Sequence, residues 1–334
     1  MPKVTIVIAY LNSAKYLPRC LSSLKLQTYQ DFEVIIIDNG STDGLVSRIN
    51  ENYPELEIHI KRLSTNRGFA VANNIGARLA RGQWLALLNA DAFPEPDWLE
   101  NLLTSAKEHP DFSCFSSCQI QANSPEYLDG TGDGYHVSGV AWRRNIDFPS
   151  DQYGLNTEEV FSPCAAAALY LREAFLEIGG FDENFFSYFE DVDLGFRLRL
   201  QGYRALYVPT AIVHHVGSAT LGINSDFSLY HSHRNLVWTF LKNMPTRLLF
   251  KYLPAHVLAN LIYMLFYTIS GRGKVIWKAK WDAVRNLTSI LKKRKEIQRT
   301  RTVTDWELLN VMERGWLQPY IRSVCHRRTV AKFK

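Results

Sequence analysis

Three short runs of Val, Ile and Leu constrain the fold of this chain more than any other feature. They cover residues 4–9, 32–37 and 84–88, and none alternates apolar with polar residues. Strands buried on both faces of a parallel sheet have this pattern. Helical periodicity at residues 16–26, with Ser13 as a candidate N-cap, and at residues 71–80 predicts helices between them. We therefore predict an α/β fold with right-handed crossovers.

Polar residues follow each of these runs. Asn12 comes after the first, Asp38 and Asn39 after the second, and Asn89 and Asp91 after the third. Parallel sheets bind ligands at the carboxyl ends of their strands, so these residues mark the expected binding edge. The chain lacks both the GxGxxG fingerprint and the GxxxxGK[ST] phosphate loop. A nicotinamide-dependent dehydrogenase and a P-loop NTPase are therefore disfavoured.

Charge divides the 334 residues into two parts. Residues 242–334 hold 20 Lys and Arg against 5 Asp and Glu, a net charge of +15, which leaves −10 for residues 1–241. We expect an acidic body at 1–241 that carries the chemistry and a basic, helical region at 242–334.

The five cysteines are scattered and form no CxxC pair, and residues 4–9 are too short for a signal-peptide core. We expect a chain of the reducing cytoplasm, without disulfides or structural zinc.

Five motifs occur in order over residues 3–240. They are Asp-Asn-Gly-Ser-Thr-Asp at 38–43, Asn-Arg-Gly-Phe at 66–69 with the Asn pair at 73–74, Asn-Ala-Asp at 89–91, Gly-Gly-Phe-Asp at 179–182, and Glu-Asp at 190–191. Together they resemble the family 2 nucleotide-sugar glycosyltransferases of GT-A fold. The rhamnosyltransferase-like branch is the most similar, because Tyr-Phe-Glu-Asp-Val-Asp at 188–193 and a later His-x-Gly-Ser at 215–218 are typical of it.

This resemblance implies a mixed, mostly parallel sheet flanked by helices, followed here by the basic helical region. It implies inverting transfer of a sugar from a nucleoside diphosphate, such as dTDP or UDP, to a glycan or lipid-linked acceptor. It also implies donor-nucleotide contacts from the strand ends and the loops beside them, namely from Ala9, Tyr10, Asn12, Asp38, Asn39, Arg67, Gly68, Asn73, Asn89 and Ala90. Two of these have an ordinary alternative, since Asp38 suits an Asx-turn and Arg67 suits an exposed surface position.

The resemblance further implies a divalent metal, Mg²⁺ or Mn²⁺. Asp91 falls where the family has its DxD motif and His215 falls in the His-x-Gly-Ser segment, so we expect these two as ligands. Asn89 replaces the first Asp of the motif. A hard cation held by carboxylates neutralises the charge that develops on a diphosphate leaving group. The alternative for Asp91 is a turn or capping residue before Pro94.

An inverting displacement needs a general base that removes the proton of the attacking hydroxyl. The adjacent carboxylates Glu190 and Asp191 supply one, and with the resemblance we expect Asp191 as the base and Glu190 as its acceptor-binding partner. Carboxylates also favour a helix N-terminus for electrostatic reasons alone, which is the alternative. We expect Asp193 to pair with Arg197, four residues later, on the helix surface.

A later basic segment, His231, His233, Arg234 and Asn235, resembles the part of the family near the diphosphate. A surface patch on a helix would look the same. His214, next to His215, is the weaker candidate ligand of that pair.

The basic region combines an apolar stretch with charged and aromatic residues. Residues 252–269 are largely apolar but contain Pro254, His256 and Asn260, and lysines interleave with Trp277 and Trp281 afterwards. Such a segment suits the headgroup layer of an anionic membrane. The alternatives are a helix packed on the body and a true membrane span. We expect a peripheral protein at the cytoplasmic face of the cell membrane. The cluster at 292–295 suits a solvated face or a nucleic-acid patch, and nothing else in the chain supports a nucleic-acid partner.

The leading hypothesis is therefore a membrane-associated glycosyltransferase. The rival from another class is a nucleotide-sugar-binding protein that has lost catalysis and serves as the membrane partner of an active enzyme. A nucleotidyltransferase is a more distant alternative, because the loop at residues 9–13 lacks the Gly-rich, basic sequence expected of one.

Overall fold

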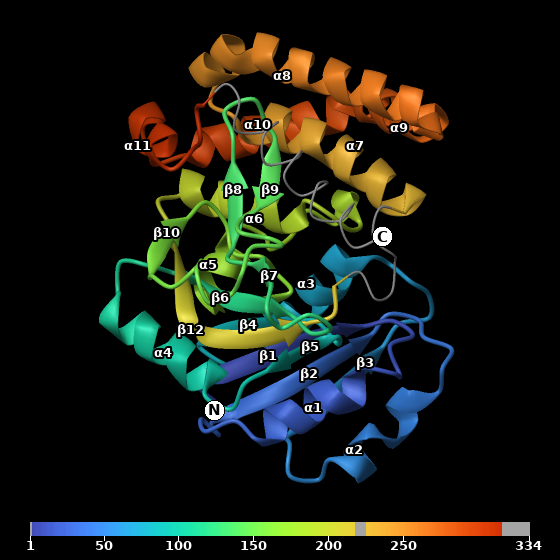
Figure 1. Ribbon diagram of the computed structural model, residues 1–334, viewed down its shortest axis with the longest axis vertical. Coiled ribbons are helices and arrows are strands. Elements are labelled where there is room, and N and C mark those ends of the chain that lie inside the picture. The colour runs from blue at the N-terminus through green and yellow to red at the C-terminus, as the bar shows by residue number, and fades with distance from the viewer. Residues whose placement is uncertain (1, 218–224, 316–334) are drawn as a thin grey trace.

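A mixed sheet forms the centre of the molecule in the computed structural model, which describes residues 2–217 and 225–315 (Figure 1). Its strand order is β10-β12-β6-β11-β4-β1-β2-β3, and β5 and β7 pair with β12 and β6. The bounds are β1 Val4–Tyr10, β2 Phe32–Asp38, β3 Ile58–Arg62, β4 Trp84–Leu88, β5 Ala92–Pro94, β6 Cys114–Gln121, β7 Leu128–Gly130, β10 Glu158–Val160, β11 Ala167–Leu171 and β12 Ala205–His215. A separate hairpin joins β8 Asp133–Tyr135 to β9 Ala141–Arg143. The predicted α/β class is confirmed.

The three apolar runs are β1, β2 and β4, which lie parallel and adjacent in the sheet. Successive residues of β1 enter opposite cores: Ile6 and Ile8 pack on one face, whereas Val7 packs on the other. This two-sided burial is the reason for their unbroken apolar sequence. The parallel arrangement places the polar ends of β1, β2 and β4 at one edge.

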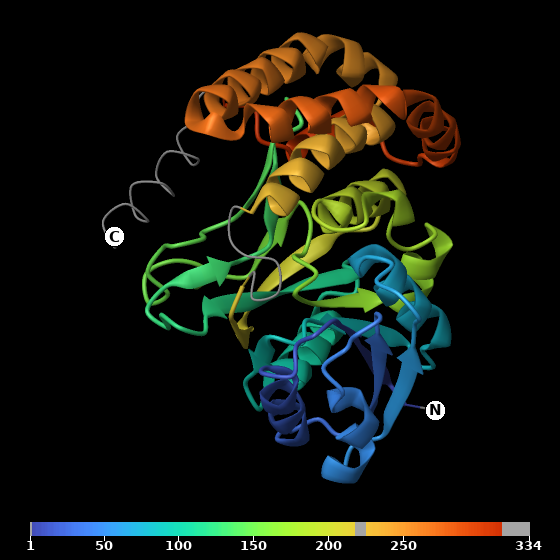
Figure 2. The ribbon, with the colours of Figure 1, turned by 90° about the vertical axis from the view of Figure 1, so that its right-hand side faces the viewer.

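Helices cover both faces of the sheet (Figure 2). One face packs against α1 Leu17–Lys25 and α4 Trp98–Glu108, with η1 Leu45–Arg48 and α2 Ile49–Asn52 beside them. The other packs against α3 Phe69–Leu79, α5 Arg172–Glu177 and α6 Glu190–Leu200. The predicted apolar face of α1 is confirmed, but Ser13 is not its N-cap. The helix starts after Tyr16, with Pro18 in its first turn, where the missing N–H of proline costs nothing.

The C-terminal helices form a further layer on α6. They are α7 Asp226–Asn243, α8 Thr246–Tyr267, the π-helical turn η3 Thr268–Arg272, α9 Gly273–Arg285, α10 Leu287–Thr300 and α11 Asp305–Asn310. Phe196 and Leu200 of α6 share one apolar core with Phe240 of α7 and Leu308 of α11. Residues 241 and 242 lie inside α7, so the division at that point remains a proposal about which part carries the chemistry.

Asp193 differs from its expected place on the helix surface. Its ion pair with Arg197 is present at 2.8 Å, but both side chains are buried. The other oxygen of Asp193 lies 2.8 Å from Nζ of Lys242, whose ammonium also contacts Asp182 at 2.6 Å. α7 covers this side of α6, and the sequence around Asp193 could not reveal that helix.

The basic cluster at 292–295 is only partly solvated. Lys293 forms an ion pair with Asp182, and Arg294 donates hydrogen bonds to the carbonyl oxygens of Leu241 and Met244. These two residues fasten α10 to the loop after α5 and to the C-terminal end of α7. Ser218 and Cys325, which figured in the sequence predictions, lie outside the described residues.

Candidate active site

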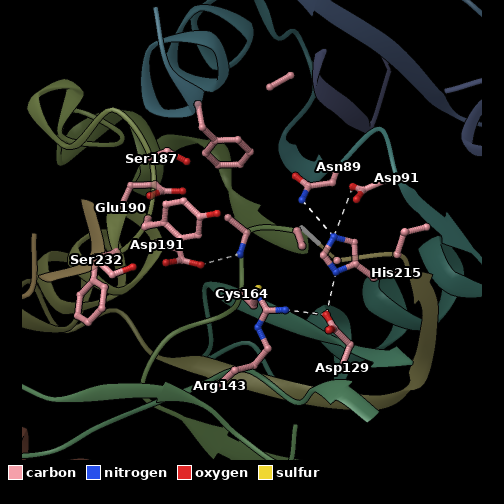
Figure 3. Close-up of a pocket in the computed structure, with 18 of the residues that line it drawn as sticks. Asn89, Asp91, Asp129, Arg143, Cys164, Ser187, Glu190, Asp191, His215 and Ser232 are labelled. Atoms are coloured by element: carbon pink, nitrogen blue, oxygen red, sulfur yellow. Dashed lines mark hydrogen bonds and ion pairs between the residues drawn. The ribbon is translucent and has the colours of Figure 1, made fainter. Parts of the chain in front are cut away.

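A cavity of about 800 Å³ opens where β1 and β4 end. Ala9 and Tyr10 at the end of β1 line it, as do Asn89, Ala90 and Asp91 after β4, Asn39 after β2, and His215 at the end of β12. Glu190 and Asp191, at the start of α6, line the opposite side (Figure 3). Residues that are far apart in the sequence therefore meet in one hollow, at the edge of the sheet where the sequence places the ligand.

Four of the expected nucleotide contacts do not line this cavity. Asn12 accepts a hydrogen bond from the backbone of Thr42, and Asp38 accepts one from the backbone of Ser41. Asn73 is buried in α3 and donates to the carbonyl oxygen of Phe69, while Arg67 is exposed. Asn12 and Asp38 shape the loop beside the cavity, and roles of these four in binding stay predictions.

Asn39 organises the loop that leads into α3. Its Nδ2 donates to Oδ1 of Asn66, and its Oδ1 accepts from the backbone N–H of Arg67. Oδ1 of Asn66 also accepts from the N–H of Gly68. Asn66 lines the cavity, whereas Arg67 of the same motif, the residue that the resemblance to the family favoured, does not.

Asp91 and His215 lie together on one wall. Nε2 of His215 is 3.4 Å from Oδ1 of Asp91 and 3.3 Å from the side-chain amide of Asn89. Nδ1 of His215 is 2.8 Å from Oδ2 of Asp129, and Arg143 contacts that same oxygen at 2.6 Å (Figure 3). A row of alternating charge thus runs from Arg143 through Asp129 and His215 to Asp91.

This row shifts the pKa values of its members. Burial alone would lower the pKa of His215, but hydrogen bonds to Asp129 and Asp91 outweigh it and raise the pKa to about 9. Burial likewise opposes ionisation of Asp129, yet Arg143 and His215 lower its pKa to about 2. A histidine whose Nδ1 is fixed by a carboxylate presents Nε2 to the cavity in one orientation.

The sequence reasoning missed Asp129 and Arg143. Asp129 reaches His215 because β7 pairs with β6 beside β12. Arg143 comes from the separate β8–β9 hairpin. Neither pairing has a local sequence signal.

The residues of the wall by Asp91 suit a divalent cation. A carboxylate, an imidazole and an amide are ligand types that Mn²⁺ and Mg²⁺ accept. Another carboxylate–histidine group, Glu33, Glu57 and His59, lies at the opposite edge of the sheet, near the start of β2. Arg81 already forms ion pairs with both of those glutamates. The positive charge that balances Glu33 and Glu57 is therefore the guanidinium of Arg81.

The opposite wall holds the half-buried carboxyl group of Asp191 and the buried ones of Glu190 and Asp133. Asp191 accepts hydrogen bonds from the backbone of Ala165 at 3.3 Å and of Val192 at 2.9 Å. Oε2 of Glu190 and Oδ2 of Asp133 are buried without a hydrogen-bond partner among the described residues. Burial raises the pKa of Asp191, against the lowering effect of Arg143, and raises the pKa of Glu190 together with the charge of Asp191. A raised pKa makes each carboxylate a stronger base, as is common for acid–base groups in active sites.

Two of the other histidine candidates lie elsewhere. Nε2 of His214 is 2.7 Å from Glu95, because alternation along β12 turns it to the other face of the sheet from His215. His233 is buried against the rings of Tyr263 and Tyr267. Within the segment 231–235, Ser232 lines the cavity.

Known proteins resemble the chain in sequence. Residues 5–179 match the family described as Glycosyl transferase family 2. N-acetylglucosaminyl-diphospho-decaprenol L-rhamnosyltransferase of Mycobacterium tuberculosis is 30% identical over 242 residues, which are 64% of this chain and 76% of that protein. Glucosyl-dolichyl phosphate glucuronosyltransferase of Haloferax volcanii is 26% identical over 188 residues, covering 54% and 56%.

Solved structures share the fold. The mannosyltransferase PcManGT of Pyrobaculum calidifontis, in complex with GDP-Man and Mn²⁺, matches 93% of this chain and 86% of its own with a TM-score of 0.56 and 18% identity. GalNAc-T7 with UDP, GalNAc and Mn²⁺ matches 72% of this chain and 48% of its own with a TM-score of 0.59 and 18% identity. The expected GT-A architecture is thereby confirmed.

The charge of Asp129 sets the pKa of His215, which leads to a direct test. Asp129→Asn keeps a hydrogen-bond acceptor but removes the charge, so the pKa of His215 should fall from about 9 toward the ordinary value. The ion pair stabilises the fold below about pH 6.5, where the imidazole is protonated in both states, and this stabilisation is lost as the pH rises through the raised pKa. An NMR titration of the metal-free protein measures the shift. Glu95→Gln, which removes the partner of His214, is the matched control, and an unchanged midpoint in Asp129→Asn would contradict the assignment.

Proposed function

The chain belongs to glycosyl transferase family 2, and we propose that it transfers a sugar, with rhamnose as the first candidate, from a nucleoside diphosphate to a hydroxyl group of a lipid-linked or cell-surface glycan. One observation carries this proposal: a single cavity has Asp91 and His215 on one wall and Glu190 and Asp191 on the other. The names of the related proteins from Mycobacterium and Haloferax, which refer to sugars on decaprenol and dolichol, support a lipid-linked acceptor.

The donor nucleotide fits the wall formed by the ends of β1, β2 and β4. Asn89 offers a side-chain amide, and Gly68 permits close approach of the backbone. Tyr10 and Asn39 are buried, and Asn39 shapes this wall through its hydrogen bonds to the loop at 66–68. Gly68 has a φ of +89°, which residues with a side chain rarely adopt. We assign dTDP or UDP to this wall.

Asp91 and His215 would hold the divalent cation, Mg²⁺ or Mn²⁺, and its binding would displace the proton from Nε2 of His215. When bound, the cation neutralises negative charge on the departing diphosphate. Asp129 fixes the ring of His215 through Nδ1, and Arg143 keeps Asp129 ionised. The wall thus presents a preorganised carboxylate and imidazole to the donor side.

Asp191 acts as the general base in this proposal. The acceptor hydroxyl loses its proton to the Asp191 carboxylate as its oxygen attacks the anomeric carbon from the face opposite the diphosphate, so the configuration inverts. Burial raises the pKa of Asp191 toward the operating pH, which makes its carboxylate a stronger base. Glu190, which lines the same wall, would contact a second hydroxyl of the acceptor.

Replacement of the base tests the mechanism. Asp191→Asn should lower kcat by about 10²–10⁴-fold, the contribution typical of a positioned acid–base group, while donor binding and thermal stability change little. Product formation from dTDP- and UDP-sugars with a prenyl-diphosphate-linked acceptor measures the rate. NMR of the anomeric carbon of the product tests inversion.

Asp305→Asn is the matched control, since Asp305 is also a carboxylate at the start of a helix but lies outside the cavity. If Asp191 served only the helix, both variants would turn over normally. That result would remove Asp191 from the mechanism. A wild-type protein that binds donor but never transfers sugar would instead favour the non-catalytic binding partner.

The C-terminal layer supports attachment to a membrane. The buried residues of α8 are half polar, His256 and Asn260 beside Leu248 and Ala259, whereas large apolar side chains lie on its outer side. A helix of a water-soluble protein usually keeps such side chains on its buried side. Exposed apolar residues continue into α9 and α10, and the set, here called the outer apolar face, comprises Phe250, Val257, Leu258, Leu261, Ile262, Leu265, Phe266, Ile269, Trp277, Trp281, Val284 and Leu291.

This face lies along the outermost edge of the molecule (Figures 1 and 2). The helical run Thr246–Arg285 is long and apolar enough to cross a membrane by length and composition. It is interrupted at Gly271, where φ is +81°, and α8 and α9 pack against each other. Exposed lysines and arginines flank the face at Arg247, Lys251, Lys274, Lys278 and Lys292. An apolar face with a basic border suits flat attachment to anionic lipid at the cytoplasmic surface of the membrane.

A charge placed in the outer apolar face should weaken that attachment. Leu265→Glu should reduce binding to vesicles of phosphatidylglycerol and phosphatidylethanolamine by at least about tenfold, because burial of one leucine contributes about 1.5–3 kcal/mol. Leu26→Glu on the far side of the sheet is the matched control, since Leu26 is 66% exposed and Leu265 64%. Cosedimentation at increasing salt measures the effect. Equal binding of both variants, or a dimer that Leu265→Glu dissociates without any vesicle binding, would contradict the proposal.

A further inference from the structure

The segment before the two catalytic carboxylates has a strained backbone. Phe186, Tyr188 and Phe189 all have φ of +67°, although none is glycine. Phe189 lies in the left-handed region, whereas Phe186, with ψ of −61°, has the backbone angles of a γ-turn with positive φ, and residues with a side chain rarely adopt either conformation. Such conformations persist only where the surroundings enforce them, and they concentrate at functional sites. Glu190 follows immediately, so the strain lies at the start of α6.

A single side chain of α7 holds this segment. Nδ2 of Asn235 donates to the carbonyl oxygens of Phe185 at 3.1 Å, Ser187 at 3.1 Å and Tyr188 at 2.7 Å. Asn235 is fully buried. Its two N–H groups are shared among three carbonyl groups that converge on one point, which only a curled backbone allows. Oδ1 of Asn235 accepts a hydrogen bond from Nε of Arg234 at 2.9 Å.

The loop on the donor side closes the segment from the other direction. The N–H of Ala70 donates to the carbonyl oxygen of Phe186 at 3.3 Å. A Cβ atom added to Gly68 would lie 2.6 Å from that same oxygen, so the two chains touch. The segment is therefore enclosed between the donor loop and α7, and its exit direction sets where Glu190 and Asp191 enter the cavity.

α7 is itself fastened to the C-terminal layer. Trp238 Nε1 donates to the carbonyl oxygen of Ala283, and the hydroxyl of Tyr230 donates to Asp282 at 2.6 Å. Asn235 lies between these two anchors. A rigid helix can hold a strained loop in place, whereas a surface side chain could follow the loop as it relaxed.

We propose that Asn235 is a positioning residue, whose side-chain amide holds residues 185–188 in their strained form and thereby orients Glu190 and Asp191 toward the acceptor. This inference rests on the proposed function, because it takes Asp191 as the base. Asn235 touches no substrate, since it does not line the cavity. Loss of its donor group lets Tyr188 and Phe189 relax to ordinary φ values, which moves the first turn of α6.

Two substitutions show whether Asn235 acts as a hydrogen-bond donor or only fills space. Asn235→Asp keeps the shape and the contact with Arg234 but replaces the N–H donors with an oxygen that repels three carbonyl groups. Asn235→Ala removes the whole amide and leaves a small void. A positioning role through hydrogen bonds predicts that both variants disorder residues 185–188, Asp at least as much as Ala. A packing role predicts that Asp, which keeps the volume, leaves this segment ordered and lowers only the thermal stability, because a buried carboxylate is costly.

The experiment compares these variants with Asn260→Ala. Asn260 is a buried asparagine of the same layer, and its Nδ2 donates to the backbone of its own helix at His256. Both Asn235 variants should lower kcat by about 10²-fold, as expected for a misplaced catalytic group, with little change in calorimetric affinity for dTDP or UDP with Mn²⁺. Amide hydrogen exchange of residues 184–193 should rise in both, and Asn260→Ala should leave it unchanged.

Two results would overturn the proposal. One is Asn235→Asp with wild-type kcat and wild-type exchange at 184–193. The other is a loss of activity that matches only the unfolded fraction in thermal denaturation. The exchange measurement does not depend on turnover, so if wild-type protein transferred no sugar the proposed function would fail while the role of Asn235 in holding the segment would still be decided.

Discussion

The buried ammonium of Lys242 joins the two parts of this molecule. It lies between Asp182, in the loop after α5, and Asp193, in the first turn of α6, and its side chain is 1% exposed. Removing one member of such a group leaves uncompensated buried charge, at a typical cost of about 3–5 kcal/mol. The contact fixes α7 on α6, and α7 in turn carries Asn235 and supports the outer helices. The positions of Glu190 and Asp191 and of the C-terminal layer thus depend on one cluster of charges.

Different interactions hold the two walls of the cavity in place. The wall at Asp91 is built on the ends of β strands, and a row of alternating charges orients His215. The wall at Asp191 is built on a helix N-terminus that follows a strained loop held from α7. On the first wall, each carboxylate has a positively charged neighbour. On the second wall this holds only in part, and Oε2 of Glu190 and Oδ2 of Asp133 have no hydrogen-bond partner among the described residues. The negatively charged nucleoside diphosphate of the proposed donor suits the first wall, and the neutral hydroxyl group of the proposed acceptor suits the second.

The sequence predicted those features of the fold that depend only on residues close together in the chain. Unbroken apolar runs predicted β1, β2 and β4, and polar residues after them predicted the edge that forms the cavity. Asp129, Arg143, Lys242 and Asn235 could not be predicted, because each acts through a partner at least 14 positions away whose pairing depends on strand register or helix packing. Asp193 shows the same limit: its bond to Arg197 follows from helical spacing, but its burial follows from α7. The burial of His256 and the exposure of Leu265 on α8 likewise could not be predicted without the packed structure.

The central claim is that this cavity binds a nucleoside diphosphate through a metal held at Asp91. Calorimetric titration of dTDP and UDP with and without Mn²⁺, on wild-type protein and on Asp91→Ala, tests it most directly. The account predicts that Mn²⁺ strengthens binding of at least one nucleotide to the wild type by tenfold or more, about 1.4 kcal/mol, and that Asp91→Ala stays folded but loses this dependence. Equal nucleotide affinity of the two proteins at every Mn²⁺ concentration would contradict it.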